Sequence, residues 1–263
     1  MKIAVDAMGG DFSPREAVRG GLQAVAEKNL RIIFVGREQE IKEELAAAGF
    51  QGDLNDPDGP VSIVDAPEVI TMDEHPATAV RKKRNSSIVV ANRLVKEGEA
   101  DAVVSAGNTG AAMAASLLTL GRIPGIARPA IAIPMPTLRG VTILLDAGAN
   151  ADCDPRDLLQ FGLMGTVYAE AIMGIPSPRV GLLSIGEEET KGNRLVLESH
   201  ELFKKSNLNF AGNVEGQELP KGVCDVAVCD GFVGNIVLKL TEGVAGVLFQ
   251  QIKEILTGSL QGK

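Results

Sequence analysis

The sequence predicts an α/β fold in which helices cover both faces of a mostly parallel sheet. Three observations support this prediction. Short runs rich in β-branched residues alternate with longer helical patterns along nearly the whole chain. The composition, 45% hydrophobic and 23% charged, is that of an ordinary globular protein. Glycine-rich polar segments follow strand after strand, at the sheet edge where open parallel sheets bind ligands.

The expected strands are short apolar runs bounded by polar or glycine-rich residues, and helices fill the intervals between them. The strands are expected at residues 2–6, 31–35, 61–64, 102–105, 130–134, 141–146, 180–185, 209–213 and 226–229. The helices are expected at residues 14–27, 38–48, 87–96, 109–121, 155–173, 194–204 and 234–256. Because the sequence has no fixed repeat and no Pro/Ser-rich linker, residues 1–263 are predicted to form one domain.

Charge and cysteine content narrow the function classes. The net charge is −8 and the chain has eight Phe, one Tyr and no Trp, so nucleic acid is a poor candidate partner. Three cysteines cannot make a complete disulfide framework, and the first residues do not read as a signal peptide, which indicates a reducing cytoplasm. No run approaches the ~18 uninterrupted apolar residues of a membrane span, so any lipid contact is expected to be peripheral.

Five polar tips follow expected strands. They are DAMGGD (6–11), SAGNTGA (105–111), DAGAN (146–150), GEEETKGN (186–193) and DGFVGN (230–235). In SAGNTGA, Asn108 or Thr109 is placed to cap a helix whose free N–H groups would attract an anion. The glycines alone would also be explained by tight turns. Five tips on one predicted sheet edge favour a polar cleft that holds a small anion.

Common catalytic constellations are missing from the sequence. There is no GxxxxGK[ST] phosphate loop, no GxSxG elbow, and the only histidines are His75 and His200, both interpreted as structural. Cys224 and Cys229 lack nearby histidines, so no metal and no cofactor are expected.

Two basic features are open to two interpretations each. Lys191 lies in a glycine-flanked turn, where it either holds an anion or forms surface ion pairs with the glutamates at 187–189. The basic run at residues 81–84 is either a solvated face or a docking surface for an acidic protein. The helix at 234–256 carries a broad apolar stripe, which suits the core or a homodimer contact, while Val237, Leu238 and Phe249 widen it enough for contact with a membrane surface.

The chain strongly resembles the PlsX family, the phosphate acyltransferases of bacterial phospholipid synthesis. The resemblance rests on a collinear series of motifs: VDAMGGD, the basic run followed by SSI, SAGNTGA, RPAIAIPMP, LLDAGAN, LQFGLMG, LLSIGEE, KGN and DGFVGN. It implies a three-layer α/β/α fold similar to the isocitrate dehydrogenase and phosphotransacetylase group. It also implies a homodimer that attaches peripherally to the membrane. Family members usually continue with a further C-terminal segment, which this chain is expected to lack.

The resemblance implies that inorganic phosphate attacks the thioester of a long-chain acyl-[acyl carrier protein], giving acyl phosphate for a downstream membrane acyltransferase. The family's active-site lysine and asparagine correspond to Lys191 and Asn235. Since phosphate is already nucleophilic, the site needs to orient it and to stabilise the oxyanion, and Asn235 is the expected oxyanion donor.

The remaining expected site residues lie at other strand ends. Ser105, Asn108 and Thr109 are expected to contact phosphate. Asp146 and Asp230 either orient Lys191, help to protonate the leaving thiolate, or act as helix caps.

Three alternatives differ from this interpretation. A phosphotransacetylase-like enzyme would use an acyl-coenzyme A thioester as donor. A metal-dependent 2-hydroxyacid dehydrogenase would need an aspartate trio and a nucleotide pocket, and neither can be assembled cleanly from the sequence. A membrane-bound scaffold of lipid synthesis would keep the apolar helix but would not need five polar strand tips.

Overall fold

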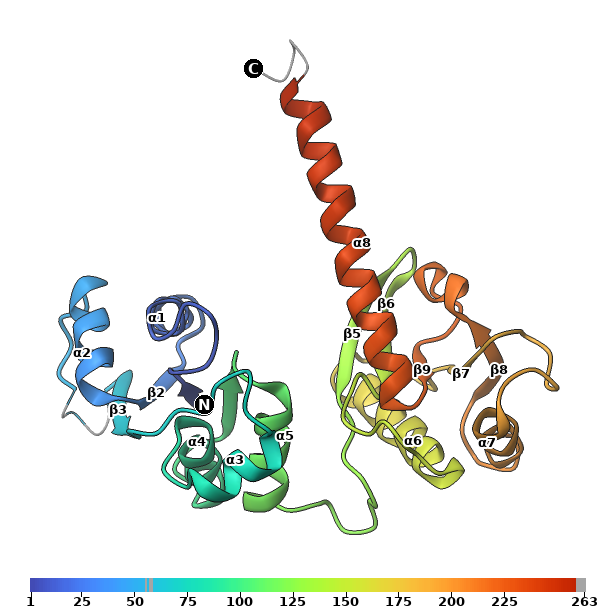
Figure 1. The fold of residues 1–263 in the computed structure, drawn as a ribbon, viewed down its shortest axis with the longest axis horizontal. Helices are drawn as coiled ribbons and strands as arrows, with labels where there is room; N and C mark the ends of the chain where they lie inside the picture. Colours follow the sequence, from blue (N-terminus) through green and yellow to red (C-terminus); the bar gives the residue numbers. More distant parts are fainter. Residues whose placement is uncertain (55, 57–58, 259–263) are drawn as a thin grey trace. The chain divides into compact units, whose positions relative to one another are not determined.

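The computed structural model describes residues 1–54, 56 and 59–258, and the chain divides into two compact units, Met1–Ile123 and Pro124–Lys263 (Figure 1). Each unit has its own sheet and its own hydrophobic core. The single domain expected for residues 1–263 stays a prediction. The segment at 121–125 contains two glycines with positive φ, Gly121 and Gly125, and it interrupts the regular structure between the two sheets.

Unit 1 contains a four-stranded, fully parallel sheet with strand order β3-β2-β1-β4. Its strands are β1 (Lys2–Asp6), β2 (Arg31–Gly36), β3 (Val61–Asp65) and β4 (Ala102–Ser105). Its helices are α1 (Arg15–Lys28), α2 (Glu38–Ala47), α3 (Pro76–Lys82), α4 (Ser87–Lys96) and α5 (Thr109–Thr119).

Side chains of the buried strands point alternately to the two faces of the unit 1 sheet, and helices pack on both faces to give three layers. Ile3 and Val5 on β1 belong to the core cluster that includes Val18 of α1 and Ile41 of α2. Ala4, on the opposite face of the same strand, belongs to the cluster that includes residues of α4. Since successive side chains on a strand point to opposite faces, an apolar run buried on both sides is what a covered parallel sheet requires.

Unit 2 contains a five-stranded sheet with order β5-β6-β9-β7-β8, in which only the β5–β6 pair is antiparallel among the described pairs. Its strands are β5 (Ala132–Thr137), β6 (Gly140–Leu145), β7 (Val180–Ser184), β8 (Phe210–Glu215) and β9 (Val226–Val228). Its helices are α6 (Pro155–Ala171), α7 (Arg194–Lys204), the 3-10 helix η1 (Gly216–Lys221) and α8 (Gly231–Gly258).

Helices also cover both faces of the unit 2 sheet. Leu158 and Phe161 of α6 and Phe203 of α7 pack in the cluster on one face. Leu219 of η1 and Val233 of α8 lie in the cluster on the other face. The predicted class, a mixed α/β fold with mostly parallel sheets, is confirmed.

Two features of the fold differ from the sequence-based expectation. The expectation places all five polar tips on one sheet edge, but DAMGGD and SAGNTGA follow strands of unit 1, while the other three follow strands of unit 2. The short helices α3 and η1 were not expected, because each follows or contains a proline and is too short to show a helical period.

Helix α8 begins in the core of unit 2 and continues as an exposed apolar helix (Figure 1). Gly231 and Gly234 are buried, but Leu240, Phe249 and Ile255 are 64%, 74% and 72% exposed. By length and composition α8 could cross a membrane, with a mean hydropathy of 1.5 in a window that is only 6% buried. The expectation of no membrane span was based on the length of uninterrupted apolar runs. Helix α8 contains isolated polar residues that interrupt such runs, but its mean hydropathy is still high.

Candidate functional site

The ends of β6 and β9 are locked together by the DAGAN and DGFVGN segments. The buried carboxylate of Asp146 accepts four hydrogen bonds, from the amides of Ile131 (2.9 Å), Ala149 (3.0 Å) and Asn150 (2.7 Å) and from the Asn150 side chain (2.8 Å). The amide of Gly231 donates to the carbonyl oxygen of Asn150 at 2.8 Å. Both oxygens of Asp146 are therefore engaged in shaping the loop.

Close packing of glycines makes this junction possible. A Cβ on Gly231 would lie 2.8 Å from Asp146 Oδ2. A Cβ on Gly148, which has a φ of +129°, would lie 3.4 Å from the Oδ1 of Asn235. Asn235 is thus held beside the DAGAN loop on the first turns of α8, in an exposed position. The expected oxyanion donor lies at the carboxyl edge of the sheet.

A pocket of about 350 Å³ opens where β7 and β9 end. Its polar lining includes Asn193 from the KGN motif and Asp230 from DGFVGN. Its apolar lining includes Leu158, Val196 and Val233. Because β7 and β9 are neighbours in the sheet, two motifs that are far apart in the sequence line one pocket. Asp230 also accepts a hydrogen bond from the amide of Val233 (2.9 Å), so it acts as a cap at the start of α8.

Lys191 immediately precedes the part of the KGN motif that lines this pocket, and its side chain is exposed. Its stem lies against Gly186, where a Cβ would come within 2.8 Å of Lys191 Cγ. Among the described residues, no carboxylate forms an ion pair with its Nζ. Glu189 instead pairs with Lys204 at 2.9 Å, and this bond is the main cause that lowers the pKa of Glu189. Lys191 is therefore available for an anion.

In unit 1, the ends of β1 and β4 form a second polar tip. The strand register places Asp6 beside Ser105, and the Ser105 hydroxyl donates to Asp6 Oδ2 at 2.7 Å and accepts from the Gly107 amide at 3.1 Å. A Cβ on Gly9 would lie 2.7 Å from the Gly107 nitrogen, so the two loops are in close contact. Sequence reasoning placed Asp6 in the DAMGGD tip but gave it no individual role, although an acid that ends a buried strand is a visible signal.

Asn108 caps α5, as one of the two expectations had it. Its Oδ1 accepts from the amide of Ala111 at 3.0 Å. Its amide nitrogen donates toward the carbonyl oxygens of Met72 (3.2 Å), Thr71 (3.4 Å) and Glu74 (3.5 Å). Both ends of the Asn108 amide are thereby used within unit 1, while Thr109, the first residue of α5, is exposed.

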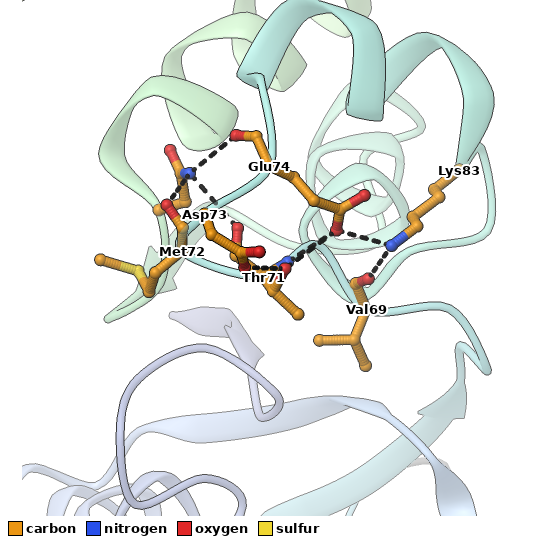
Figure 2. A network of polar contacts seen from close by, with 7 residues as sticks. Val69, Thr71, Met72, Asp73, Glu74 and Lys83 are labelled. Carbon is orange, nitrogen blue, oxygen red and sulfur yellow. Dashed lines mark hydrogen bonds and ion pairs between the residues drawn. The ribbon is translucent and has the colours of Figure 1, made fainter.

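Figure 2 shows the network that shapes the loop held by Asn108. Lys83 Nζ donates to Glu74 Oε2 (2.6 Å) and to the carbonyl oxygen of Val69 (2.7 Å). Thr71 donates its amide to the same carboxylate oxygen at 2.9 Å. The bond from Lys83, followed by the one from Thr71, lowers the pKa of Glu74. The ammonium group of Lys83 therefore stabilises this loop. Of the four charges in the basic run, this one is already paired within unit 1 and is not offered to an acidic partner.

The cysteines are poor nucleophiles. Burial raises the pKa of Cys153 to about 11 and that of Cys224 to about 12. Burial also raises the pKa of Cys229, which lines the pocket. A thiol with so high a pKa is protonated at neutral pH and does not attack a thioester.

The two histidines have different environments. His75 lies at the N-cap of α3, and its Nδ1 is 3.4 Å from Thr78 Oγ1. His200 is 3% exposed and hydrogen-bonded to Asn213. The structural interpretation of both residues agrees with these contacts, and Asn213 is a buried polar residue that sequence reasoning missed because its partners are distant in the chain.

Gly234→Ala is expected to destabilise unit 2 by about 3 kcal/mol or more. A Cβ at this position would overlap the backbone carbonyl oxygen of Asp146 and lie 3.1 Å from Cys229 Sγ, and a backbone atom cannot rotate away. Urea unfolding checks the expectation. Gly243→Ala is the matched control on the same helix: a Cβ there meets nothing within 4 Å, so helix propensity alone should stabilise it by up to ~1 kcal/mol. Equal stability of the two variants would contradict this account of the junction.

Comparison with known sequences identifies close relatives. The family described as "Fatty acid synthesis protein" matches residues 1–263. A phosphate acyltransferase from Pelotomaculum thermopropionicum is 58% identical over all of this chain, which spans 75% of that protein. A phosphate acyltransferase from Desulfitobacterium hafniense is also 58% identical, over 98% of this chain and 76% of its own length. These relatives confirm that the chain is an acyltransferase.

Solved structures show a shared fold at low sequence identity. A phosphotransacetylase from Streptococcus pyogenes superimposes with a TM-score of 0.68 and 20% identity, covering 93% of this chain and 82% of that one. The EutD phosphotransacetylase from Staphylococcus aureus gives a TM-score of 0.65 and 18% identity, with the same coverage. The fold-group expectation for phosphotransacetylases is confirmed, and by sequence the chain belongs to the fatty acid synthesis protein family, whose similar members are phosphate acyltransferases.

Proposed function

We propose that this chain transfers a long-chain acyl group from acyl carrier protein to inorganic phosphate, giving acyl phosphate for phospholipid synthesis. The names of the relatives support the coarser statement of acyl transfer to phosphate. The observation that carries the proposal is the pocket at the ends of β7 and β9, because the KGN and DGFVGN motifs both contribute to its lining. Lys191, which is exposed and pairs with no carboxylate among the described residues, immediately precedes the lining residues Gly192 and Asn193.

The proposed reaction needs no covalent intermediate on the enzyme. Lys191 binds phosphate, a phosphate oxygen attacks the thioester carbonyl carbon, and the carbonyl oxygen becomes an oxyanion that accepts a hydrogen bond from Asn235. The C–S bond then breaks, the acyl–phosphate bond remains, and the carrier thiolate takes up a proton. The raised pKa values of the Cys153 and Cys224 thiols fit this direct displacement.

The other predicted residues have narrower roles in this proposal. Asp146 and Asp230 position the loops that carry the site, since their carboxylates already accept hydrogen bonds from the chain. Of the predicted phosphate contacts Ser105, Asn108 and Thr109 at the tip of unit 1, the first two already use their side chains in hydrogen bonds within unit 1. The exposed N-terminus of α5 at Thr109 is the part of that tip best suited to an anion.

The decisive experiment follows loss of acyl thioester with and without phosphate, using acyl carrier protein and coenzyme A donors side by side. The proposal expects phosphate-dependent release of carrier thiol and accumulation of acyl phosphate. Preference for the coenzyme A donor would favour a phosphotransacetylase-like enzyme instead. Absence of turnover with either donor, in a folded chain that binds vesicles, would favour the scaffold.

We propose further that the chain forms a cytoplasmic homodimer that attaches peripherally to a membrane, so that insoluble acyl phosphate is released at the bilayer surface. The exposed apolar half of α8 supports this proposal. Phe249→Glu is expected to lower co-sedimentation with anionic vesicles roughly tenfold or more, because it removes a large apolar side chain from the lipid-facing surface. Dimer mass, thermal stability and turnover in solution should persist.

Gln251→Glu is the matched control, since it adds the same charge at an exposed polar position on the same helix. It should leave most vesicle binding intact. If Phe249→Glu instead splits the dimer or lowers thermal stability, this surface is a subunit contact and the attachment site lies elsewhere.

A further inference from the structure

The segment that carries Lys191 is a loop between β7 and α7, and its backbone is held at several points. The Lys191 amide donates to the carbonyl oxygen of Glu188 at 3.0 Å, which closes a turn. Gly192 follows with a φ of +124°, and a Cβ there would lie 2.6 Å from Val196 Cγ1. These contacts set the shape of the turn, but they do not attach it to the sheet.

Two polar side chains from the sheet make that attachment. Asn213 of β8, which is 7% exposed, donates its Nδ2 to the carbonyl oxygen of Glu188 (2.9 Å) and toward that of Lys191 (3.4 Å). The Ser184 hydroxyl at the end of β7 donates to the same Lys191 carbonyl oxygen at 3.1 Å. The backbone of Lys191 is therefore tied to two strands of unit 2.

His200 of α7 sets the orientation of the Asn213 amide. Its Nδ1 lies 2.9 Å from Asn213 Oδ1, and since that oxygen can only accept, Nδ1 must carry the proton. Carbonyl oxygens face the other end of the amide, so a flipped Asn213 would oppose acceptor to acceptor at one end and donor to donor at the other. The imidazole is itself held edge-to-face on Phe210, with ring centroids 5.0 Å apart.

The outer nitrogen of His200 faces a charged pair. Its Nε2 is 3.8 Å from Glu189 Oε1, and Glu189 accepts from Lys204 at 3.0 and 2.9 Å. Glu189 belongs to the same loop as Lys191. The imidazole thus contacts the loop both through Asn213 and through Glu189.

We propose that His200 and Asn213 are positioning residues that hold the Lys191 turn in the geometry that binds phosphate. This inference rests on the proposed function, in which Lys191 binds the phosphate that attacks the thioester. Neither side chain touches the substrate. Their effect is exerted through the backbone of Glu188 and Lys191, and a displacement of about 1 Å in a binding group can cost roughly 100-fold in rate.

Two substitutions break the connection at different bonds. Asn213→Asp keeps the size and the acceptor for His200, but it puts a carboxylate oxygen against two carbonyl oxygens. His200→Phe keeps a ring against Phe210 but removes the Nδ1 donor. Both are expected to raise the KM for phosphate about tenfold or more, with the KM for the acyl donor within about twofold of the parent. His200→Asn returns an amide donor near the Nδ1 position and should restore the KM for phosphate to within about threefold.

Asn209→Asp is the matched control for the charge change. It lies just before β8, and its side chain donates to the carbonyl oxygen of Ser177 at 2.8 Å, away from the Lys191 loop. Thermal unfolding of each variant separates the positioning role from a purely structural one. A structural role would lower the melting temperature and leave the KM for phosphate of the folded fraction unchanged, and that result would overturn the inference.

Combination with Lys191→Ala distinguishes failure of this inference from failure of the proposed function. If Asn213 acts through Lys191, adding Asn213→Asp to Lys191→Ala should cause no further loss in phosphate affinity, measured by titration calorimetry with inorganic phosphate. If Lys191→Ala weakens phosphate binding and Asn213→Asp and His200→Phe do not, the positioning role is wrong and the proposed function stands. If Lys191→Ala itself leaves phosphate binding unchanged, the assignment of Lys191 is wrong and the positioning role fails with it.

Discussion

Lys191→Ala is expected to lower kcat/KM for phosphate by roughly 100-fold, because a hydrogen bond to a charged group contributes up to ~3 kcal/mol. The side chain is exposed, on a loop between β7 and α7, and forms no ion pair among the residues that the structure describes. Its removal therefore leaves no buried charge unpaired, and the fold should persist. Steady-state kinetics at varied phosphate and a thermal unfolding curve check the two halves of the expectation.

The control for this variant is Lys205→Ala. Lys205 is an exposed lysine at the C-cap of α7, with a 3.7 Å ion pair to Glu201 on the helix surface. It should keep parental kinetics, since exposed ion pairs contribute little. A well-folded Lys191→Ala chain with near-normal turnover would show that phosphate binds elsewhere.

Asn235→Asp is expected to lower kcat by about 100-fold or more, with a smaller change in the KM for either substrate. The substitution keeps the size of the side chain but replaces an amide donor by a carboxylate, which repels the oxyanion formed in the transition state. Because the ground-state carbonyl carries less charge than the oxyanion, the loss should appear mainly in kcat. Asn235 is exposed beside Gly148, so the chain has room for the carboxylate.

Asn207→Asp provides the same chemical change at an exposed position in the turn after α7, before β8 begins. It should leave both kinetic constants unchanged. A change confined to KM in Asn235→Asp would assign Asn235 to ground-state binding and remove it from oxyanion stabilisation.

Local sequence signals predicted the elements well where the pattern was strong. The expected strands at 2–6 and 102–105 and the expected helices at 87–96 and 194–204 have the observed bounds of β1, β4, α4 and α7. In each case an apolar run of the right period ends at polar or glycine residues, so its limits are encoded locally. Capping of α5 by Asn108 is also a local property, since the side chain bonds to an amide three residues ahead.

The start of α8 shows where local signals fail. The helix was expected from residue 234, but it begins at Gly231. Glycine is a poor helix former, so Gly231 argued locally against an earlier start, and the expected helix began at Gly234. Both glycines face the DAGAN loop with no space for a Cβ, and this packing requirement outweighs propensity.

The sequence by itself determined the α/β class, most element bounds to within about two residues and the glycine-rich strand ends, and its family motifs predicted the roles of Lys191 and Asn235. Only the tertiary structure decided that the strands form two sheets, that Glu189 pairs with Lys204 and leaves Lys191 without a carboxylate partner among the described residues, and that Lys83 turns inward to Glu74. The physical reason is the separation along the chain between the residues that interact. Periodicity, capping and turn chemistry act between neighbours in the chain, whereas strand order, ion-pair choice and the His200–Asn213 contact depend on which distant segments pack together.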